Sequence, residues 1–253
     1  MVQRLLEPGE IEALDHTSIP RLLLPQPRSL FAARAQRLRQ LANNDIKGIP
    51  VGDTLRGYLL LMAALVDAQA AVTLALPADG IALPSKESIT VALENNMPPL
   101  PVSGARPAAW RSVFTSLLDQ LDTLATSQPQ LSSVLGELRA LDDAQLEGAA
   151  DAVLEQFSDG INPLQAPFIA AALQVVWTLQ ASQLDANRVQ PLVTGTLCPV
   201  CGSHPVASVI RIGGQSQGYR YLQCSMCASE WHMVRVKCSC CEKNAHIAYQ
   251  SLT

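Results

Sequence analysis

Six of the seven cysteines form three Cys-x-x-Cys pairs, and none of the seven occurs before residue 198. The pairs are Cys198/Cys201, Cys224/Cys227 and Cys238/Cys241. Two thiolates at this spacing share one tight turn, and two such turns supply four soft ligands in the tetrahedral arrangement that zinc or a mononuclear iron prefers. The spacing therefore predicts a four-cysteine metal site in the last part of the chain.

The sequence between the first two pairs indicates a β-hairpin. Residues 205–212 alternate and contain several β-branched side chains, glycines mark a turn, and residues 219–222 are typical of a returning strand. This is the layout of a zinc ribbon or a rubredoxin-like site. It predicts that one zinc or iron ion is bound by Cys198, Cys201, Cys224 and Cys227. Buried free thiols or a disulfide framework are the alternatives, and the chain shows no secretory signal that would favour disulfides.

The third pair has no fourth pair to complete a second four-cysteine site. Cys238 and Cys241 therefore predict half of a second site. Cys240, His232 and His246 are the side chains that would complete it as a mixed Cys/His site. Alternatively, this thiol cluster stays without metal and forms a disulfide, or it bridges two copies of the chain as a homodimer.

Apolar residues recur with helical spacing over most of the chain that precedes the cysteines. The pattern predicts six or seven helices in an irregular bundle, with Asp142 and Gln145 as a capping box for one of them. A proline-rich N-terminal segment is expected to run extended over the surface. A linker at 185–196 then separates a mainly α domain, residues 1–186, from a small cysteine-rich β domain, residues 187–253, with an incomplete second site.

Charge is distributed unevenly between these two parts. The net charge of the chain is −4, and the acidic excess lies in the helical part, which argues against a general nucleic-acid-binding protein. The two most apolar stretches, 58–76 and 167–184, have polar interruptions, so we expect buried core helices and no membrane span. No targeting signal is evident, and clustered reduced thiols fit a cytoplasmic protein.

The sequence offers no catalytic constellation. We find no Gly-rich phosphate loop, no nucleophile elbow and no His-Glu-x-x-His motif. A catalytic metal keeps an open coordination position, whereas four cysteines close the coordination shell. We therefore expect that the protein is not an enzyme.

Three runs surround the cysteines: CPVCGSHPVAS at 198–208, GYRYLQCSMC at 218–227 and EWHMVRVKC at 230–238. Upstream lie PQPRSLF at 25–31, RAQRL at 34–38 and APFIAAAL at 166–173. Together these runs resemble the formate dehydrogenase accessory protein family, FdhE. The resemblance covers essentially the whole chain and is tightest after residue 198.

The resemblance implies a cytoplasmic, non-catalytic accessory protein that is needed for active respiratory formate dehydrogenase and associates with its catalytic subunit before export. It also implies a helical domain followed by two rubredoxin-like sites that have been linked to iron. The sequence is C-terminally shortened relative to the family pattern, and Cys240 stands where the third pair usually has a different residue. We therefore expect one metal ion.

Strand alternation over residues 230–237 leaves Arg235 and Lys237 as candidates for partner contact, because a basic edge suits an acidic partner surface. Two other functions would use the same cysteines. One is a rubredoxin-like iron protein that carries electrons. The other is a zinc-ribbon binding module for nucleic acid, which the acidic helical part disfavours.

Overall fold

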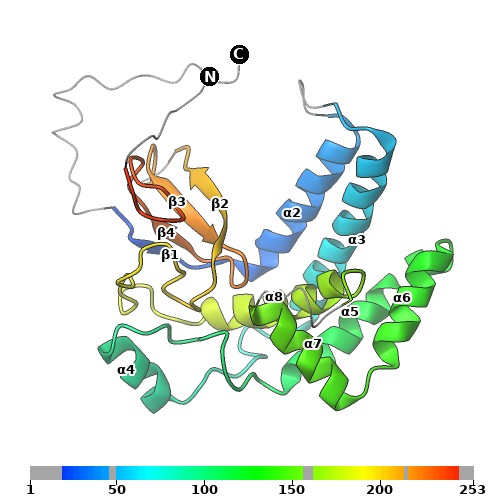
Figure 1. Cartoon of the computed structure of the whole chain (residues 1–253), viewed down its shortest axis with the longest axis horizontal. Coiled ribbons are helices and arrows are strands. Elements are labelled where there is room, and N and C mark those ends of the chain that lie inside the picture. Colours follow the sequence, from blue (N-terminus) through cyan, green and yellow to red (C-terminus); the bar gives the residue numbers. More distant parts are fainter. Residues whose placement is uncertain (1–18, 46–49, 156–161, 214–215, 245–253) are drawn as a thin grey trace.

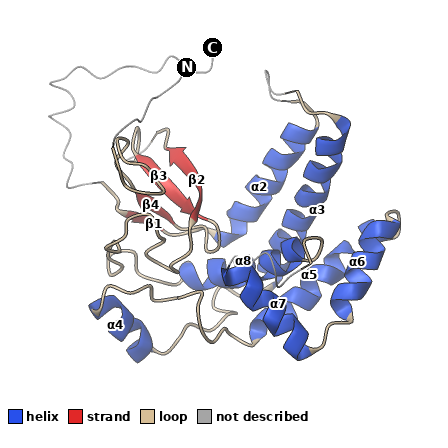
Figure 2. Ribbon diagram, viewed as in Figure 1, coloured by secondary structure: helices blue, strands red, loops and turns tan. Residues whose placement is uncertain are grey.

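The computed structural model describes residues 19–45, 50–155, 162–213 and 216–244. Within these ranges the chain forms seven helices and four short strands (Figures 1 and 2). The helices are α2 (Pro27–Ala42), α3 (Asp53–Ala75), α4 (Lys86–Glu94), α5 (Ala109–Ala125), α6 (Pro129–Arg139), α7 (Asp143–Glu155) and α8 (Ala166–Ala181). The strands are β1 (Leu22–Leu23), β2 (Pro205–Ile210), β3 (Arg220–Cys224) and β4 (Glu230–His232). A mainly α chain with a small β module is confirmed, and the boundary at residue 186 stays a prediction.

Helix α8 is the centre of the helical body. Twelve of its 16 residues are buried, and a helix that is apolar on all sides has to be surrounded by other elements. Helices α3, α5 and α7 pack around it, and α2 packs along α3. The polar face of α5 stays in solvent, while its apolar face, from Trp110 to Leu121, is buried. Helix α8 is therefore the buried centre of the predicted bundle.

The four strands form one antiparallel sheet in the order β1-β4-β3-β2. The predicted hairpin is present as β2 and β3. Residues 1–18 of the proline-rich N-terminal segment lie outside the described residues. The described rest differs from expectation, because its strand β1 pairs with β4 and places Leu22 opposite Trp231. Two contacts fix it there: Leu22 is buried, and the Tyr221 hydroxyl donates to the carbonyl of Pro20 at 2.8 Å. The first and last described parts of the chain therefore share one sheet.

Helix α3 alone among the described helices is long and apolar enough, by length and composition, to cross a membrane. Its C-terminal half is part of the core, as predicted for this stretch, because Leu65 and Val72 are buried. Gln69 in this half donates from Nε2 to the carbonyl of Ala171 in α8 at 2.9 Å. The N-terminal end of α3 projects with α2 beyond the helical body (Figure 1).

Helix α7 begins with the predicted capping box. The backbone N–H of Gln145 donates to Asp142 Oδ1 at 2.8 Å, and the N–H of Asp142 donates to Gln145 Oε1 at 3.0 Å. These reciprocal bonds satisfy two backbone donors that the first turn of a helix leaves without partners. The start of α7 is therefore fixed by local sequence.

One carboxylate of α7 ties this helix to α5 and to the loop before it. Glu147 accepts hydrogen bonds from Arg106 Nε at 2.6 Å, Arg111 Nε at 2.8 Å and Trp110 Nε1 at 3.0 Å. The Arg106 side chain is only 8% exposed. Burial raises the pKa of Glu147, but the bonds from Arg106, Arg111 and Trp110 outweigh it, so the pKa lies below its ordinary value. The carboxylate is thus held in its charged form.

We expect Glu147→Gln to lower the free energy of unfolding by about 1–3 kcal/mol at pH 7, because the buried Arg106 loses one of its two charged acceptors and keeps only Asp151. A carboxyl group whose folded pKa is depressed stabilises the fold above its unfolded pKa, about 4.3, and this contribution disappears as the pH falls through the folded pKa. Urea unfolding from pH 7 down to pH 3 should show the difference from the unsubstituted chain shrinking with acid. Glu94→Gln, at an exposed position, is the control, and an equal effect there would contradict the assignment.

Candidate metal centre

The first cysteine pair folds as a tight knuckle directly before the sheet. The backbone N–H of Cys198 donates to the carbonyl of Ser203 at 2.9 Å, and the N–H of Gly202 donates to the carbonyl of Cys198 at 2.8 Å. Gly202 has a φ of 80°, a left-handed conformation that glycine adopts without the usual steric cost. The knuckle therefore needs a residue that tolerates this conformation directly after Cys201.

The second pair repeats this geometry at the end of β3. The N–H of Cys224 donates to the carbonyl of Ser229 at 2.9 Å, and Ala228, one residue after Cys227, has a φ of 57°. The backbone N–H groups of Met226 and Cys227 approach Cys224 Sγ at 3.3 and 3.4 Å. Amides that point at a sulfur stabilise its thiolate form, which is the form that binds a metal.

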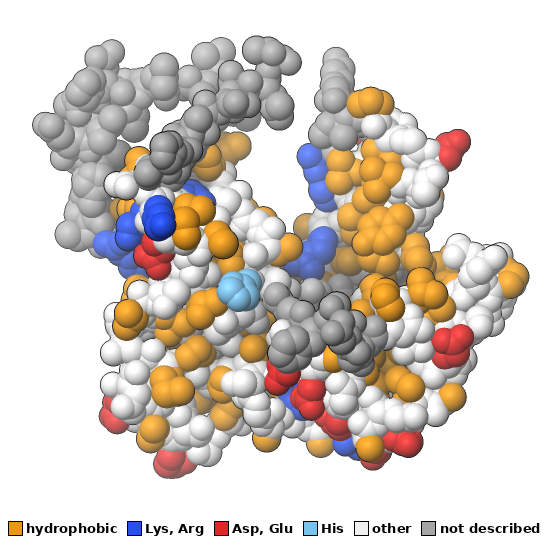
Figure 3. All heavy atoms as spheres, in the orientation of Figure 1, with side chains coloured by type: hydrophobic (Ala, Val, Ile, Leu, Met, Phe, Trp, Pro, Cys, Tyr) orange, Lys and Arg blue, Asp and Glu red, His pale blue; other side chains and the backbone are white. Residues whose placement is uncertain are grey.

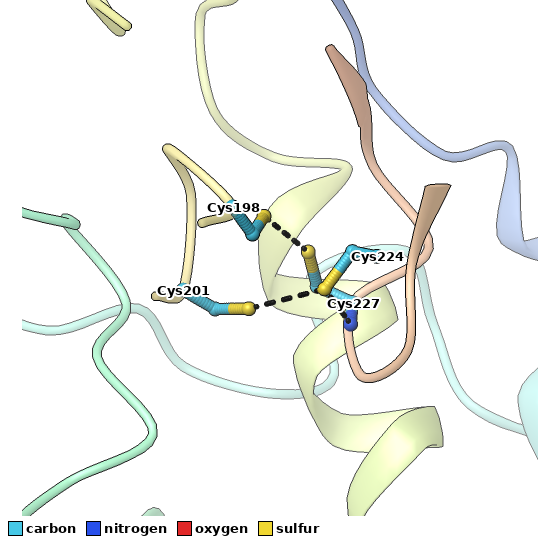
Figure 4. A group of neighbouring side chains, drawn as sticks. All are labelled: Cys198, Cys201, Cys224 and Cys227. Carbon is cyan, nitrogen blue, oxygen red and sulfur yellow. Dashed lines mark hydrogen bonds between the residues drawn. The ribbon is translucent and has the colours of Figure 1, made fainter. Parts of the chain in front are cut away.

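The two knuckles face each other and bring four sulfurs together (Figure 4). Cys198 Sγ lies 3.6 Å from Cys227 Sγ, and Cys201 Sγ lies 3.4 Å from Cys224 Sγ. All four sulfurs lie within 4.8 Å of one another. Ligands placed 2.3 Å from a tetrahedral ion are about 3.8 Å apart, so these separations fit one zinc or iron ion. Each of the four cysteines is at most 1% exposed.

Burial sets the proton chemistry of these thiols. It raises the pKa of Cys198 and of Cys227 well above the ordinary value. Burial also acts to raise the pKa of Cys201, but hydrogen bonds from the other three thiols and from Ser203 lower it well below the ordinary value. A metal ion needs all the thiolates, so binding releases protons and weakens as the pH falls.

Two serine hydroxyls also contact the sulfurs, and the sequence patterns did not indicate them. Ser203 Oγ lies 3.4 Å from Cys201 Sγ, and Ser229 Oγ lies 3.2 Å from Cys227 Sγ. Each serine follows the first cysteine of its pair by five positions. That shared spacing is the signal that would have found them. In each knuckle the backbone N–H of the first cysteine donates to the carbonyl of this serine.

The first knuckle is held against the helical body through an extended loop. The N–H groups of Leu100 and Val102 donate to the carbonyls of Val200 and Cys201 at 3.0 and 3.1 Å. The same loop is fixed to α8, because Trp177 Nε1 donates to the carbonyl of Leu100 at 3.0 Å. Helix α8 therefore positions Cys201 through the loop that contains Leu100 and Val102.

The second knuckle is held by two glutamine side chains, of which Gln69 is buried and Gln174 is half-buried. Gln174 of α8 donates from Nε2 to the carbonyl of Ser225, between Cys224 and Cys227, at 3.0 Å. Gln69 of α3 donates in turn to Gln174 Oε1 at 3.0 Å. We call Gln69, Gln174 and the Ser225 carbonyl the glutamine relay. It links α3, α8 and the second knuckle.

The third pair adopts the same backbone turn at the surface. The N–H of Cys238 donates to the carbonyl of Lys243 at 2.9 Å, and Glu242 has a φ of 58°. Hydrogen bonds from the backbone of Cys240 and Cys241 lower the pKa of Cys238. The backbone geometry of the two buried knuckles is thus repeated at the third pair. Among the described residues no second cysteine pair faces it. Cys240 and Cys241 are exposed.

In the described ranges, the four buried cysteines are the one group of three or more potential ligands that gathers. His232 packs edge-on against the rings of Tyr219 and Tyr221, with centroids 5.9 and 5.8 Å away. Burial lowers the pKa of His232. His246 lies outside the described residues. A half-site at Cys238 and Cys241 stays a prediction.

Arg235 and Lys237, predicted to contact a partner, are both exposed. Arg235 donates to the carbonyl of Gly218, and Lys237 Nζ lies 3.4 Å from Glu242 Oε2. The carbonyl of Lys237 also accepts a bond from Arg220 Nη1 at 2.6 Å. The two side chains thus lie on the segment that leads from β4 to the third knuckle.

A helical body joined to a buried four-cysteine centre on two facing knuckles defines a protein with a rubredoxin-like or zinc-ribbon module. The family is also shown by sequence. "FdhE, N-terminal" matches residues 19–194, and "FdhE, central domain" matches residues 197–235. The chain belongs to the FdhE family.

Relatives in this family match along nearly the whole chain. The Protein FdhE homolog of Pseudomonas aeruginosa is 40% identical, covering 100% of this chain and 77% of the relative. The homolog of Pectobacterium atrosepticum is 38% identical, covering 99% and 76%. The crystal structure of the FdhE protein from Pseudomonas aeruginosa superposes with a TM-score of 0.77 at 36% identity, covering 92% of this chain and 76% of that one.

We expect the purified chain to contain about one zinc or iron ion, because four thiolates close one tetrahedral shell. Elemental mass spectrometry of anaerobically purified protein measures this directly. The double variant Cys198→Ser/Cys224→Ser should lose the ion, because each knuckle then keeps a single thiolate. Cys238→Ser/Cys241→Ser is the matched control and should retain it. Equal metal loss in both double variants would show that the third pair contributes ligands.

We expect Gln174→Leu to speed metal transfer to a chelator and to cost about 1–2 kcal/mol of stability, because the carbonyl of Ser225 loses its donor. Gln183→Leu is the control: Gln183 donates to the carbonyls of Ile81 and Leu179, away from both buried knuckles. Its substitution should affect stability but not the transfer rate. The same transfer rate in both variants would exclude a role of the glutamine relay at the centre.

Proposed function

We propose that this chain is an accessory protein for respiratory formate dehydrogenase that binds the catalytic subunit in the cytoplasm during maturation. The observation that carries the proposal is membership of the FdhE family along both the helical part and the cysteine module. The family is one of formate dehydrogenase accessory proteins. The chain itself catalyses no reaction in this proposal.

In the proposed function the four-cysteine metal centre has a structural role. Cys198, Cys201, Cys224 and Cys227 bind one zinc or iron ion and leave no coordination position for a substrate. Support comes from the contacts around the sulfurs, because loop residues and Gln174 attach both knuckles to the helical body. A bound ion thereby fixes the sheet on α8. The surface that a partner meets is then composed of both parts in one arrangement.

A second candidate function is a rubredoxin-like electron carrier. Two amides and two hydroxyls near the sulfurs favour it, because hydrogen bonds to thiolates set the reduction potential of iron–sulfur sites. The complete burial of the four cysteines favours the structural task instead. A centre that is filled with zinc has no redox couple and excludes the carrier.

Binding to the catalytic subunit tests the main proposal. Metal-loaded chain is immobilised, and the dissociation constant for purified formate dehydrogenase catalytic subunit of the same organism is measured. We expect Arg235→Ala/Lys237→Ala to weaken binding about tenfold with metal content unchanged, because exposed charges contribute mostly to association.

Lys86→Ala/Arg188→Ala removes two exposed basic side chains elsewhere and should leave the constant unaltered. If the unsubstituted chain shows no binding, the proposed function is wrong. If it binds and both double variants bind equally well, only the assignment of Arg235 and Lys237 is wrong.

A further inference from the structure

Each buried knuckle ends in the same short pattern, Cys-x-x-Cys-x-Ser. Ser203 follows Cys201 by two positions, and Ser229 follows Cys227 by two positions. The residue between cysteine and serine has a left-handed conformation in both knuckles, with φ angles of 80° and 57°. This turn brings each serine hydroxyl back to the sulfur of the preceding cysteine, at 3.4 Å in the first knuckle and 3.2 Å in the second. Each half of the centre therefore consists of two thiols and one hydroxyl.

The backbone turn itself does not require these serines. The third knuckle makes the same turn, because the N–H of Cys238 donates to the carbonyl of Lys243 at 2.9 Å and Glu242 has a φ of 58°. Lys243 occupies the serine position there and is exposed, and lysine and arginine side chains gather where this knuckle reaches the surface (Figure 3). By contrast, Ser203 is 9% exposed and Ser229 is 0% exposed. The serines therefore accompany the burial of the sulfurs and not the turn.

Each serine hydroxyl needs an acceptor for its own proton. While the neighbouring cysteine is a thiol, its S–H donates to the serine oxygen. The sulfur is the one hydrogen-bond partner of each hydroxyl among the described residues, so the serine O–H is then left without an acceptor, which is unfavourable for a buried donor. A thiolate has no proton and only accepts, so the bond reverses when the cysteine ionises to bind a metal. The serine protons are thus satisfied in the thiolate form.

The metal-bound centre carries excess negative charge away from water. Four thiolates outnumber the charges of one zinc or ferrous ion, and each of the four cysteines is at most 1% exposed. Buried charge has to be compensated by hydrogen-bond donors. The backbone amides of Met226 and Cys227 already point at Cys224 Sγ. The two serine hydroxyls extend this compensation to the sulfurs of Cys201 and Cys227.

We propose that Ser203 and Ser229 are positioning residues of the metal centre, whose hydroxyls donate to the thiolates of Cys201 and Cys227 and retain the ion in the buried site. The inference rests on the metal centre of the proposed function and is independent of binding to formate dehydrogenase. Donors behind the ligands of a metal site raise its affinity for the ion. When the ion is iron, they also favour the ferrous form, because this form leaves more negative charge on the sulfurs.

The first measurement is zinc affinity, determined anaerobically by competition with a chelator. We expect Ser203→Ala/Ser229→Ala to lower the affinity about 10- to 100-fold, which is the usual effect of removing hydrogen-bond partners of metal ligands. Ser182→Ala/Ser208→Ala is the matched control. It also removes two hydrogen-bonded hydroxyls, but these contact a carbonyl of α8 and an arginine side chain rather than sulfurs, so it should leave the affinity unchanged.

The second measurement is the reduction potential of the iron-loaded chain, because hydrogen bonds to the sulfurs set this potential. We expect a more negative potential in Ser203→Ala/Ser229→Ala, since the lost bonds stabilise the ferrous form more than the ferric form. A serine that only supports the fold of its knuckle would leave the potential of the iron-loaded fraction unchanged.

The outcomes separate the role of the serines from the proposed function. Unchanged zinc affinity in Ser203→Ala/Ser229→Ala overturns the inference alone, as does an equal loss of affinity in Ser182→Ala/Ser208→Ala. Lower affinity with an unchanged reduction potential also overturns it, because the serines then act only on the fold. If the unsubstituted chain takes up neither zinc nor iron, the metal centre of the proposed function is wrong, and the inference is wrong with it.

Discussion

The attachment of the two buried knuckles to α8 is the interaction on which the rest of this structure depends. Gln174 of α8 donates directly to a backbone carbonyl of the second knuckle. Trp177 of α8 holds the first knuckle indirectly, because it donates to the carbonyl of Leu100 in the loop that binds this knuckle. The four metal ligands therefore belong to the same buried cluster as the core residues of the helices. Losing the ion would leave the thiols of Cys198 and Cys227, whose pKa values burial raises, uncoordinated at the contact between the sheet and the helices.

The sequence could predict the features that depend on local pattern. Helical periodicity predicted the bundle, the capping box at Asp142 and Gln145 formed as expected, and the cysteine spacing indicated the two facing knuckles. Strand β1 was missed because two residues among prolines carry no periodic signal, and their pairing partner lies at Trp231. The glutamine relay was missed for a similar reason: a buried amide has no sequence signature apart from its partner, and Gln69 and Gln174 meet only after folding.

Helix α3 has two environments along its length. Its C-terminal half supplies core residues and Gln69, the first member of the glutamine relay, while Leu55 and Tyr58 near its N-terminus are exposed. Helix α3 is thereby linked to the second knuckle by the hydrogen bonds of Gln69 and Gln174.

The pairing of Leu22 with Trp231 also sets an order of events during synthesis. Ribosomes add about 5–20 residues per second, so about 10–40 seconds pass between the emergence of these two strand partners. Throughout that interval the helices can assemble on α8 as it appears, but β1 has no strand beside it. Strand β1 precedes all the described helices in the chain and yet is among the last of the described elements to be fixed, and a nascent chain exposes Leu22 until the cysteine module has been made.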